Sequence, residues 1–214
     1  MTHLQWWIHH VPQKFGNVLP HFGGLIPVRL TIEFRRMAPF DEAALMHVDA
    51  DGQVRERLDW TMLRYGPVVL FRKTVVLSES VEWLRRHEYT VAQADCEKCC
   101  SEQEVLWTIG GALGFHRRPD PNLNGFNDDC RDVEVPGMGG FAVVLDRFDV
   151  VAAAFPEFAC QVLDILARTS WDNLLFGRRL LCLVRSEDPW IQFGPVGGHE
   201  PWWNQREWFN ADRA

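Results

Sequence analysis

The sequence lacks the roughly 18–20 consecutive apolar residues that a membrane-spanning helix requires. Its amino-terminal stretch, MTHLQWWIHHVPQKFG, has neither the charged start nor the continuous apolar segment of a secretion signal. We therefore expect a cytoplasmic protein. Two of the six cysteines, Cys160 and Cys182, lie within apolar runs, where free cysteines behave as small core hydrophobes. Without a secretion signal, a disulfide framework is not expected.

Positive charge is also scarce, because 22 Lys and Arg stand against 29 Asp and Glu and leave a formal net charge of −7. Proteins that bind nucleic acid through its phosphates need a positive surface, so direct nucleic-acid binding is disfavoured. A basic protein partner is compatible with this balance. Repeats and low-complexity segments are absent, and the 47% apolar and 24% charged residues are ordinary for a globular protein.

The first part of the chain favours β-structure. Residues 28–35, VRLTIEFR, alternate between apolar and polar side chains, which is typical of a half-buried strand. The pair Asp51-Gly52 is a hairpin-turn signal, and residues 67–71, PVVLF, form a further apolar run. We interpret residues 1–76 as a β-rich amino-terminal extension.

After residue 77, apolar runs of strand length alternate with helical patterns, which predicts an α/β domain over residues 77–186. Its strands should lie parallel in one sheet. The expected strands lie near 90–94, 141–146 and 180–184, and the expected helices cover 102–113 and 156–168. The remaining residues, 187–214, form an aromatic carboxy-terminal tail that we expect to pack on the domain, with a role as a partner anchor as the alternative.

The segment PNLNGFNDDCRDV, residues 121–133, is the most informative one. At 100° per residue, Leu123, Phe126, Cys130 and Val133 share one face of a helix. The opposite, polar face carries Asn124, Asp128 and Asp132, and Asn127 lies between the two faces. The pattern predicts an amphipathic helix from about 122 to 133 whose wet face is acidic and amide-rich.

Over about residues 88–186 a series of motifs occurs in the order ADC, SEQEVLWTIGGALGF, NLNGFNDDCRDV, FAVVLDRFD, FPEFACQVLDILA and LLCLV. This series resembles the barstar-type ribonuclease inhibitors. The resemblance also extends upstream, as in longer relatives with an amino-terminal extension. It implies a small α/β layer with a three-stranded parallel sheet and packed helices, which here follows the β-containing amino-terminal extension. It also implies an inhibitor that blocks a basic nuclease active site without a covalent bond.

The resemblance assigns the central partner contact to Asp128, with Asn124, Asn127 and Asp132 beside it. Asn124 stands where the family usually has its first aspartate, and Asn127 stands where the best-known member has tryptophan. The loop before the helix departs further, since Arg118-Pro119-Asp120-Pro121 replaces a Tyr-Tyr-Gly-like segment and His116 and Arg117 precede it. These changes put the usual nuclease partner in question.

The resemblance also implies a carboxylate on the later helix. Asp164 and Asp172 are both near the expected place, and the sequence does not choose between them.

Other kinds of site are less well supported by the sequence. The thiols in Cys96-x-x-Cys99-Cys100 could form half a zinc site, but no second ligand pair follows nearby. His9-His10 and His116 have no paired base or nucleophile at interpretable spacing, and GMGG at 137–140 precedes a strand rather than opening a helix, which indicates a turn. We therefore expect an inhibitor or immunity-type protein that binds a basic protein partner, not an enzyme, with no cofactor, metal or membrane contact. The alternative is a generic protein-interaction module that keeps the fold but no longer binds a nuclease.

Overall fold

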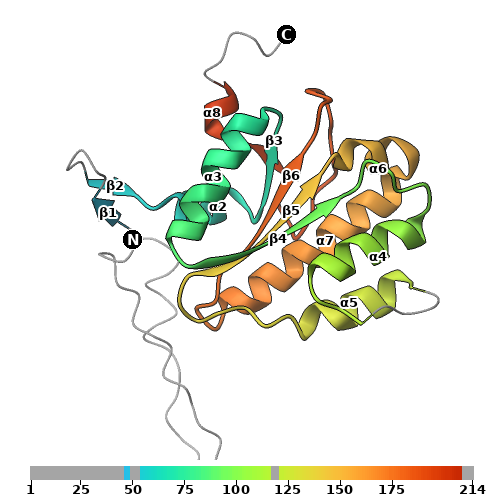
Figure 1. The fold of residues 1–214 in the computed structure, drawn as a ribbon, viewed down its shortest axis with the longest axis horizontal. Coiled ribbons are helices and arrows are strands. Elements are labelled where there is room, and N and C mark those ends of the chain that lie inside the picture. The colour runs from blue at the N-terminus through green and yellow to red at the C-terminus, as the bar shows by residue number, and fades with distance from the viewer. Residues whose placement is uncertain (1–45, 49–53, 117–120, 209–214) are drawn as a thin grey trace, which may run out of the picture. The chain divides into compact units, whose positions relative to one another are not determined.

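The computed structural model describes residues 46–48, 54–116 and 121–208 of the 214-residue chain (Figure 1). The strand expected at 28–35, the histidines at 9 and 10 and the turn at Asp51-Gly52 lie outside the described residues. The described helices and strands are β1 (Met46–Val48), β2 (Val54–Glu56), α2 (Leu58–Tyr65), β3 (Val68–Phe71), α3 (Thr74–Arg86), β4 (Tyr89–Asp95), α4 (Glu102–Ala112), α5 (Leu123–Arg131), β5 (Gly140–Asp146), α6 (Phe148–Ala154), α7 (Pro156–Leu174), β6 (Leu180–Arg185), β7 (Trp202–Trp203) and α8 (Gln205–Trp208).

Five of these strands form a parallel sheet in the order β4-β5-β6-β3-β7, which confirms the α/β class. The three strands expected from the sequence, β4, β5 and β6, are adjacent and parallel as predicted. The sheet is wider than the three-stranded layer that the resemblance implies, because β3 pairs with the outer edge of β6 and β7 pairs with β3. Strand β6 is apolar on both faces, and such a strand is stable only when it is covered and paired on both sides.

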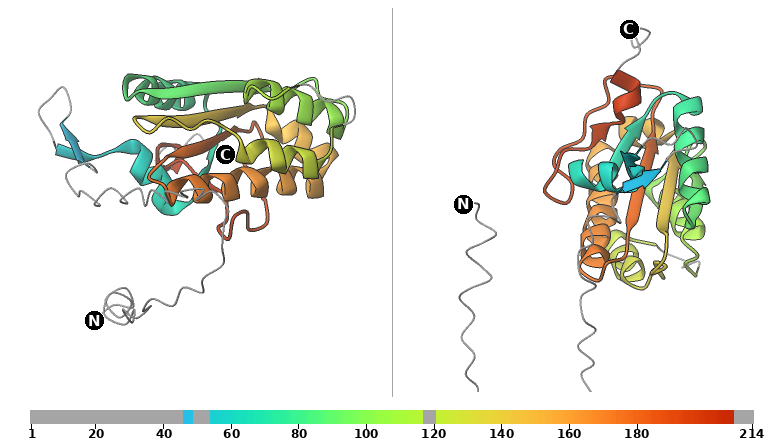
Figure 2. Two further views of the ribbon diagram at one scale, coloured as in Figure 1. Left: turned by 90° about the horizontal axis from the view of Figure 1, so that it is seen from below. Right: turned by 90° about the vertical axis from the view of Figure 1, so that its left-hand side faces the viewer.

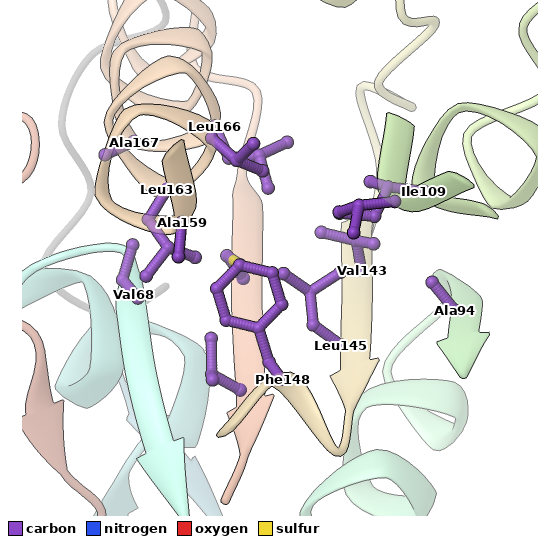
Figure 3. Close-up of a cluster of buried hydrophobic side chains, with 14 of the residues drawn as sticks. Val68, Ala94, Ile109, Val143, Leu145, Phe148, Ala159, Leu163, Leu166 and Ala167 are labelled. Atoms are coloured by element: carbon purple, nitrogen blue, oxygen red, sulfur yellow. The ribbon is translucent and has the colours of Figure 1, made fainter. Parts of the chain in front are cut away.

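Helices cover both faces of this sheet. On one face, α2 and α3 pack on Val69, Phe71, Ala142, Val144, Leu181 and Leu183. On the other face, α4, α6 and α7 pack on the alternate residues of the same strands, and α5 adds its apolar side chains to this core from outside (Figure 2). Figure 3 shows part of this larger core, where Phe148 lies among Val143, Leu145 and residues of α7. The strict alternation along each strand is what a sheet with two buried faces requires.

The buried carboxylate of Asp59 links α2 to the amino-terminal ends of β4 and β6. Asp59 is fully buried, and it accepts hydrogen bonds from Arg57 Nη2 at 2.9 Å and from the Tyr89 hydroxyl at 2.8 Å. Arg179, just before β6, lies 3.4 Å from the same carboxylate. Burial, and next to it the charge of Asp59, raises the pKa of Tyr89 well above its usual value. A charge buried in this way is tolerated because its partners are fixed around it.

The carboxy-terminal tail returns to the sheet. Strand β7 pairs with β3, and the indole of Trp202 donates a hydrogen bond to the Gly66 carbonyl at 3.1 Å. Glu207, which is 3% exposed, accepts hydrogen bonds from the backbone N–H groups of Arg72 and Lys73 at 3.2 and 3.0 Å. Its carboxylate thereby caps the start of α3, where the helix dipole favours negative charge.

The upstream segments contribute to this architecture as well. Strands β1 and β2 pair antiparallel, with Met46 opposite Glu56. Strand β3, which corresponds to the apolar run at 67–71, lies within the five-stranded sheet although it precedes residue 77. The central sheet thus draws strands from upstream of residue 77, from the 77–186 region and from the tail.

The turn before β5 lies very close to the backbone just before β4. Gly139 has φ +68°, and a Cβ built there would lie 2.0 Å from the Glu88 carbonyl oxygen. We expect Gly139→Ala to lower the free energy of unfolding by at least about 3 kcal/mol, because both the backbone conformation and the clash oppose a side chain. Gly137→Ala is the matched control, since no atom lies within 4 Å of its added Cβ. Urea denaturation measures both, and equal effects of the two substitutions would contradict the close approach.

Candidate protein-binding surface

Helix α5 lies on the outside of the helical layer, where it packs against α7 and α4 (Figure 1). It begins at Asn122, whose side-chain oxygen accepts a hydrogen bond from the Gly125 N–H at 3.0 Å. Phe126 and Cys130 point into the core and are 4% and 0% exposed. Phe126 makes an edge contact with Phe115, with ring centroids 5.9 Å apart. The helix is thus anchored along one side only.

The other side of α5 brings the predicted residues together. Asn124, Asp128 and Asp132 are exposed, and Asn127 is half-buried at the border of the polar face. This is the register that the 3.6-residue period predicts, with Phe126 and Cys130 inside and Asn124 and Asp128 outside. We refer to Asn124, Asn127, Asp128 and Asp132 as the acidic face. A binding role for it is a prediction that the geometry alone does not test.

The charge of Asp128 is only weakly compensated. Its carboxylate lies 3.8 Å from Arg131 Nη1, one turn along the helix. Both side chains are more than two-thirds exposed, so the pair is solvated and contributes little to stability. Asp128 can therefore exchange Arg131 for a cation of a partner at small cost.

The two candidate aspartates on α7 have different surroundings. Asp164 accepts a hydrogen bond from the Gly197 N–H at 2.8 Å and pairs with Arg168 at 2.7 Å, so it holds the loop before β7. Asp172 is exposed one turn after Thr169, which lies close to the Cys130 thiol of α5. Asp164 is therefore engaged by the tail, whereas Asp172 is the exposed carboxylate of the two.

A groove of about 400 Å³ runs between α4 and α5 beside the acidic face. Its lining includes two carboxylates and an imidazole as well as aromatic side chains, among them Glu104, Trp107, Phe115, His116, Phe126 and Asp129. The Glu104 carboxylate accepts a hydrogen bond from the Cys100 N–H at 2.6 Å, and this bond is part of the cap at the start of α4. Asp129 lines the groove but is not among the residues that the sequence analysis selected. It directly follows Asp128, and the one feature of the sequence that indicates its position toward α4 is its spacing of three residues from Phe126.

A second pocket lies at the carboxyl ends of the parallel strands, where α/β proteins often bind ligands. It is about 430 Å³ and lies between α3 and the ends of β4, β5 and β6. Asp95 and Asp146 face Arg85 and Arg185 in it, and Arg185 is paired with Asp146. Its charges balance, so it offers no net charge to a ligand. Nearby, Arg147 bridges the loops after β4 and β6 through Glu97 at 3.2 Å and Glu187 at 3.4 Å.

The cysteines of the 96–100 cluster do not converge on a metal. Cys96 and Cys99 are buried and Cys100 is exposed. Within the described ranges, no group of three or more His, Cys, Asp or Glu side chains could hold a metal ion. Burial raises the pKa values of the Cys96 and Cys182 thiols above the ordinary thiol value, which keeps both neutral and unreactive.

Comparison with known protein families and curated proteins finds no relative of this chain. No protein-family model matches the chain, and the curated proteins contain no significant match. One solved structure, "Structure of Drosophila ORC bound to DNA", aligns with a TM-score of 0.42 and 17% identity over 63% of this chain and 35% of that chain. A likeness at this level carries neither a fold family nor a function to this protein. Among the described helices, none has both the length and the apolar character needed to cross a bilayer.

The anchoring of α5 can be measured by removing its main apolar contact. We expect Phe126→Ala to lower the free energy of unfolding by about 3–5 kcal/mol, because the buried ring belongs to the larger core and packs against Phe115. Asn127→Ala, one residue along the same helix and half-buried, should cost less than about 1 kcal/mol. Chemical denaturation followed by circular dichroism measures both. A small effect of Phe126→Ala would mean that α5 is not held by its buried side.

The buried thiol of α5 gives a pH prediction. Burial raises the pKa of the Cys130 thiol from 9.0 to about 12. A thiol whose folded pKa is raised stabilises the fold fully below its unfolded pKa, and this contribution is lost as the pH rises from about 9 toward 12. We expect the unfolding free energy to fall by up to about 1.4 kcal/mol per pH unit for this group over that window. The fall should be shallower in Cys130→Ala and unchanged in Cys100→Ala, and equal slopes in all three proteins would contradict the burial of this thiol.

Proposed function

We propose that this chain is a barstar-type protein that inhibits a ribonuclease or nuclease toxin by covering its active site without a covalent bond. The observation that carries the proposal is the acidic face of α5, of which all residues but the half-buried Asn127 are exposed, while Phe126 and Cys130 anchor the opposite side of the helix in the core. A rigid, preorganised set of polar groups on one helix suits tight recognition, because little ordering is needed on binding.

The order of elements supports the family resemblance as well. Between β4 and β6 the chain runs strand, two helices, strand, two helices, strand, and the motifs quoted for the resemblance follow this order. The sequence segment NLNGFNDDC falls on α5, the second helix of the first crossover. In the proposed family this is the helix that enters the nuclease cleft.

The chemistry of the target explains the acidic face. Ribonucleases bind the phosphates of RNA with Arg, Lys and His, so carboxylates on an inhibitor can occupy the places of phosphates. Complementary charge speeds the encounter and fixes the orientation of the complex. In the proposed complex Asp128 is the central contact and Asn124, Asn127 and Asp132 surround it. Asp172 of α7 supplies the further carboxylate, since it is the exposed one of the two candidates on that helix.

A second candidate function is a protein-interaction module that has lost nuclease recognition. It is favoured by the two amides, Asn124 and Asn127, at positions where the family has a charge and an aromatic ring, and by Arg131 at 3.8 Å from Asp128. Such a face carries less negative charge toward a phosphate-binding cleft. The two functions differ in whether the affinity depends on the charge of Asp128.

Substitution of Asp128 separates the two functions. We expect Asp128→Ala to weaken binding to a ribonuclease of the kind that barstar-type inhibitors block by about 2–5 kcal/mol, because cations buried in the complex would lose their partner. Asn124→Asp should tighten the same complex by restoring a charge. Isothermal titration calorimetry at low and moderate salt measures both.

Glu82→Gln is the control for this comparison. Glu82 is exposed on α3, which covers the opposite face of the sheet, so its neutralisation changes the net charge equally without touching the acidic face. An Asp128→Ala complex within about 0.5 kcal/mol of the unsubstituted one would identify the acidic face as a solvated surface. The interaction-module function would then be the correct one.

A further inference from the structure

Exposed apolar side chains gather at one corner of the described structure. Five large hydrophobic residues in the described ranges are more than half exposed, and three of them belong to the two loops at the amino ends of β5 and β6. These are Met138, Leu175 and Phe176, which are 76%, 71% and 80% exposed, and we call them the apolar corner. Isolated exposed hydrophobic residues are normal, but several in adjacent loops mark an interaction site.

Hydrogen bonds tie the two loops to each other. Arg179 Nε donates to the Gly139 carbonyl at 2.9 Å, and the Phe141 N–H donates to the Arg179 carbonyl at 2.8 Å. Met138 directly precedes Gly139, and Phe176 lies three residues before Arg179. The apolar corner is therefore formed by two segments that are distant in sequence and joined at their bases.

The turn that carries Phe176 is fixed rather than loose. The Gly177 N–H donates to the Leu174 carbonyl at 2.9 Å, and the Arg178 N–H donates to the Asn173 carbonyl at 3.1 Å. Gly177 has φ +71°, a conformation that glycine adopts without strain. The end of α7 thus fixes the backbone that carries the exposed Phe176 side chain, so little ordering of the main chain is needed when a partner binds.

Exposed carboxylates flank the apolar corner along the chain. Asp172 is exposed on the last turns of α7, shortly before Leu175, and Glu134 is exposed in the segment that leads from α5 to Met138. From Asp128 onward, exposed carboxylates therefore follow the chain toward Met138. Protein interfaces commonly combine an apolar contact that excludes water with charged groups around it.

We propose that the apolar corner and the acidic face form one docking surface for a basic protein, in which the partner packs an apolar patch beside its basic cleft onto Met138, Leu175 and Phe176. This inference rests on the proposed function and names the second contact that such a partner makes. The carboxylates set orientation and association rate, and the apolar corner slows dissociation.

Charge argues against other occupants of this surface. A second copy of this chain would bring Asp128, Asp132, Glu134 and Asp172 against the same carboxylates, and the nearby Arg131 and Arg178 offset only part of this negative charge, so the two copies would repel one another. The negative surface of a membrane would be repelled in the same way. A partner of positive charge is the occupant that these groups attract.

The test compares two exposed aromatic residues in the full chain. The binding partner is the ribonuclease that also tests Asp128→Ala. Phe176→Ser is expected to weaken binding of this ribonuclease by about tenfold or more, mainly through faster dissociation, and to leave the melting temperature of the chain unchanged. Trp190→Ser is the matched control, because Trp190 is 79% exposed but follows β6, at the carboxyl end of the sheet. Its binding should stay within about twofold of the unsubstituted protein. Surface plasmon resonance gives both rate constants, and sedimentation of the free chain shows whether it self-associates.

The outcomes distinguish this inference from the proposed function. If the unsubstituted chain does not bind the ribonuclease, the proposed function fails and the inference fails with it. If Asp128→Ala weakens the complex but Phe176→Ser does not, the proposed function stands and the apolar corner is not part of the surface. A dimer of the free chain that Phe176→Ser dissociates would make a second copy the occupant and would overturn the inference.

Discussion

The structure depends on two strands that are apolar on both faces. In β5, Phe141, Val143 and Leu145 point to one side and Ala142 and Val144 to the other, and all five are buried. Strand β6 repeats the pattern with a run that is buried from Leu180 to Val184. Neither strand can present a face to water, so each face of the sheet must be covered by helices. A layer with helices on one face alone would leave the second set of side chains exposed.

This constraint explains why the chain needs its upstream segment. Helices α2 and α3 precede the motifs that resemble barstar-type inhibitors, and their buried residues, such as Met62 and Leu84, cover the second face. Strand β3 protects the edge of β6 that would otherwise remain open, and β7 covers β3. Asp59 then couples the covering helix to the strands through Tyr89 and Arg179. Helices α2 and α3 and strand β3 are therefore integral parts of the sheet domain.

The sequence predicted the elements whose side chains repeat with a regular period. Phe126 and Cys130 lie three and four residues from their neighbours on the α5 stripe, and this spacing was sufficient to predict which side of α5 is buried. Contacts between segments that are far apart in the sequence produce no such periodic pattern of residues. The two-residue strand β7 is too short for a periodic signal, and the engagement of Asp164 by the Gly197 N–H depends on where the tail lies. The place of Asp129 in the groove was not predicted, because it depends on the position of α4 beside α5.

The place of α5 in the layers bears on how its function can vary. It packs on α7 and α4, which themselves cover the sheet, so only one side of α5 is needed for folding. Residues of the acidic face can therefore change at little cost in stability, whereas changes at Phe126 would disturb the core. Asn124 and Asn127, which replace a charge and an aromatic ring of the family resemblance, lie among these permissive positions. Substitutions on this exposed side are thus easier for the fold to accommodate than substitutions on the side that packs against α7 and α4.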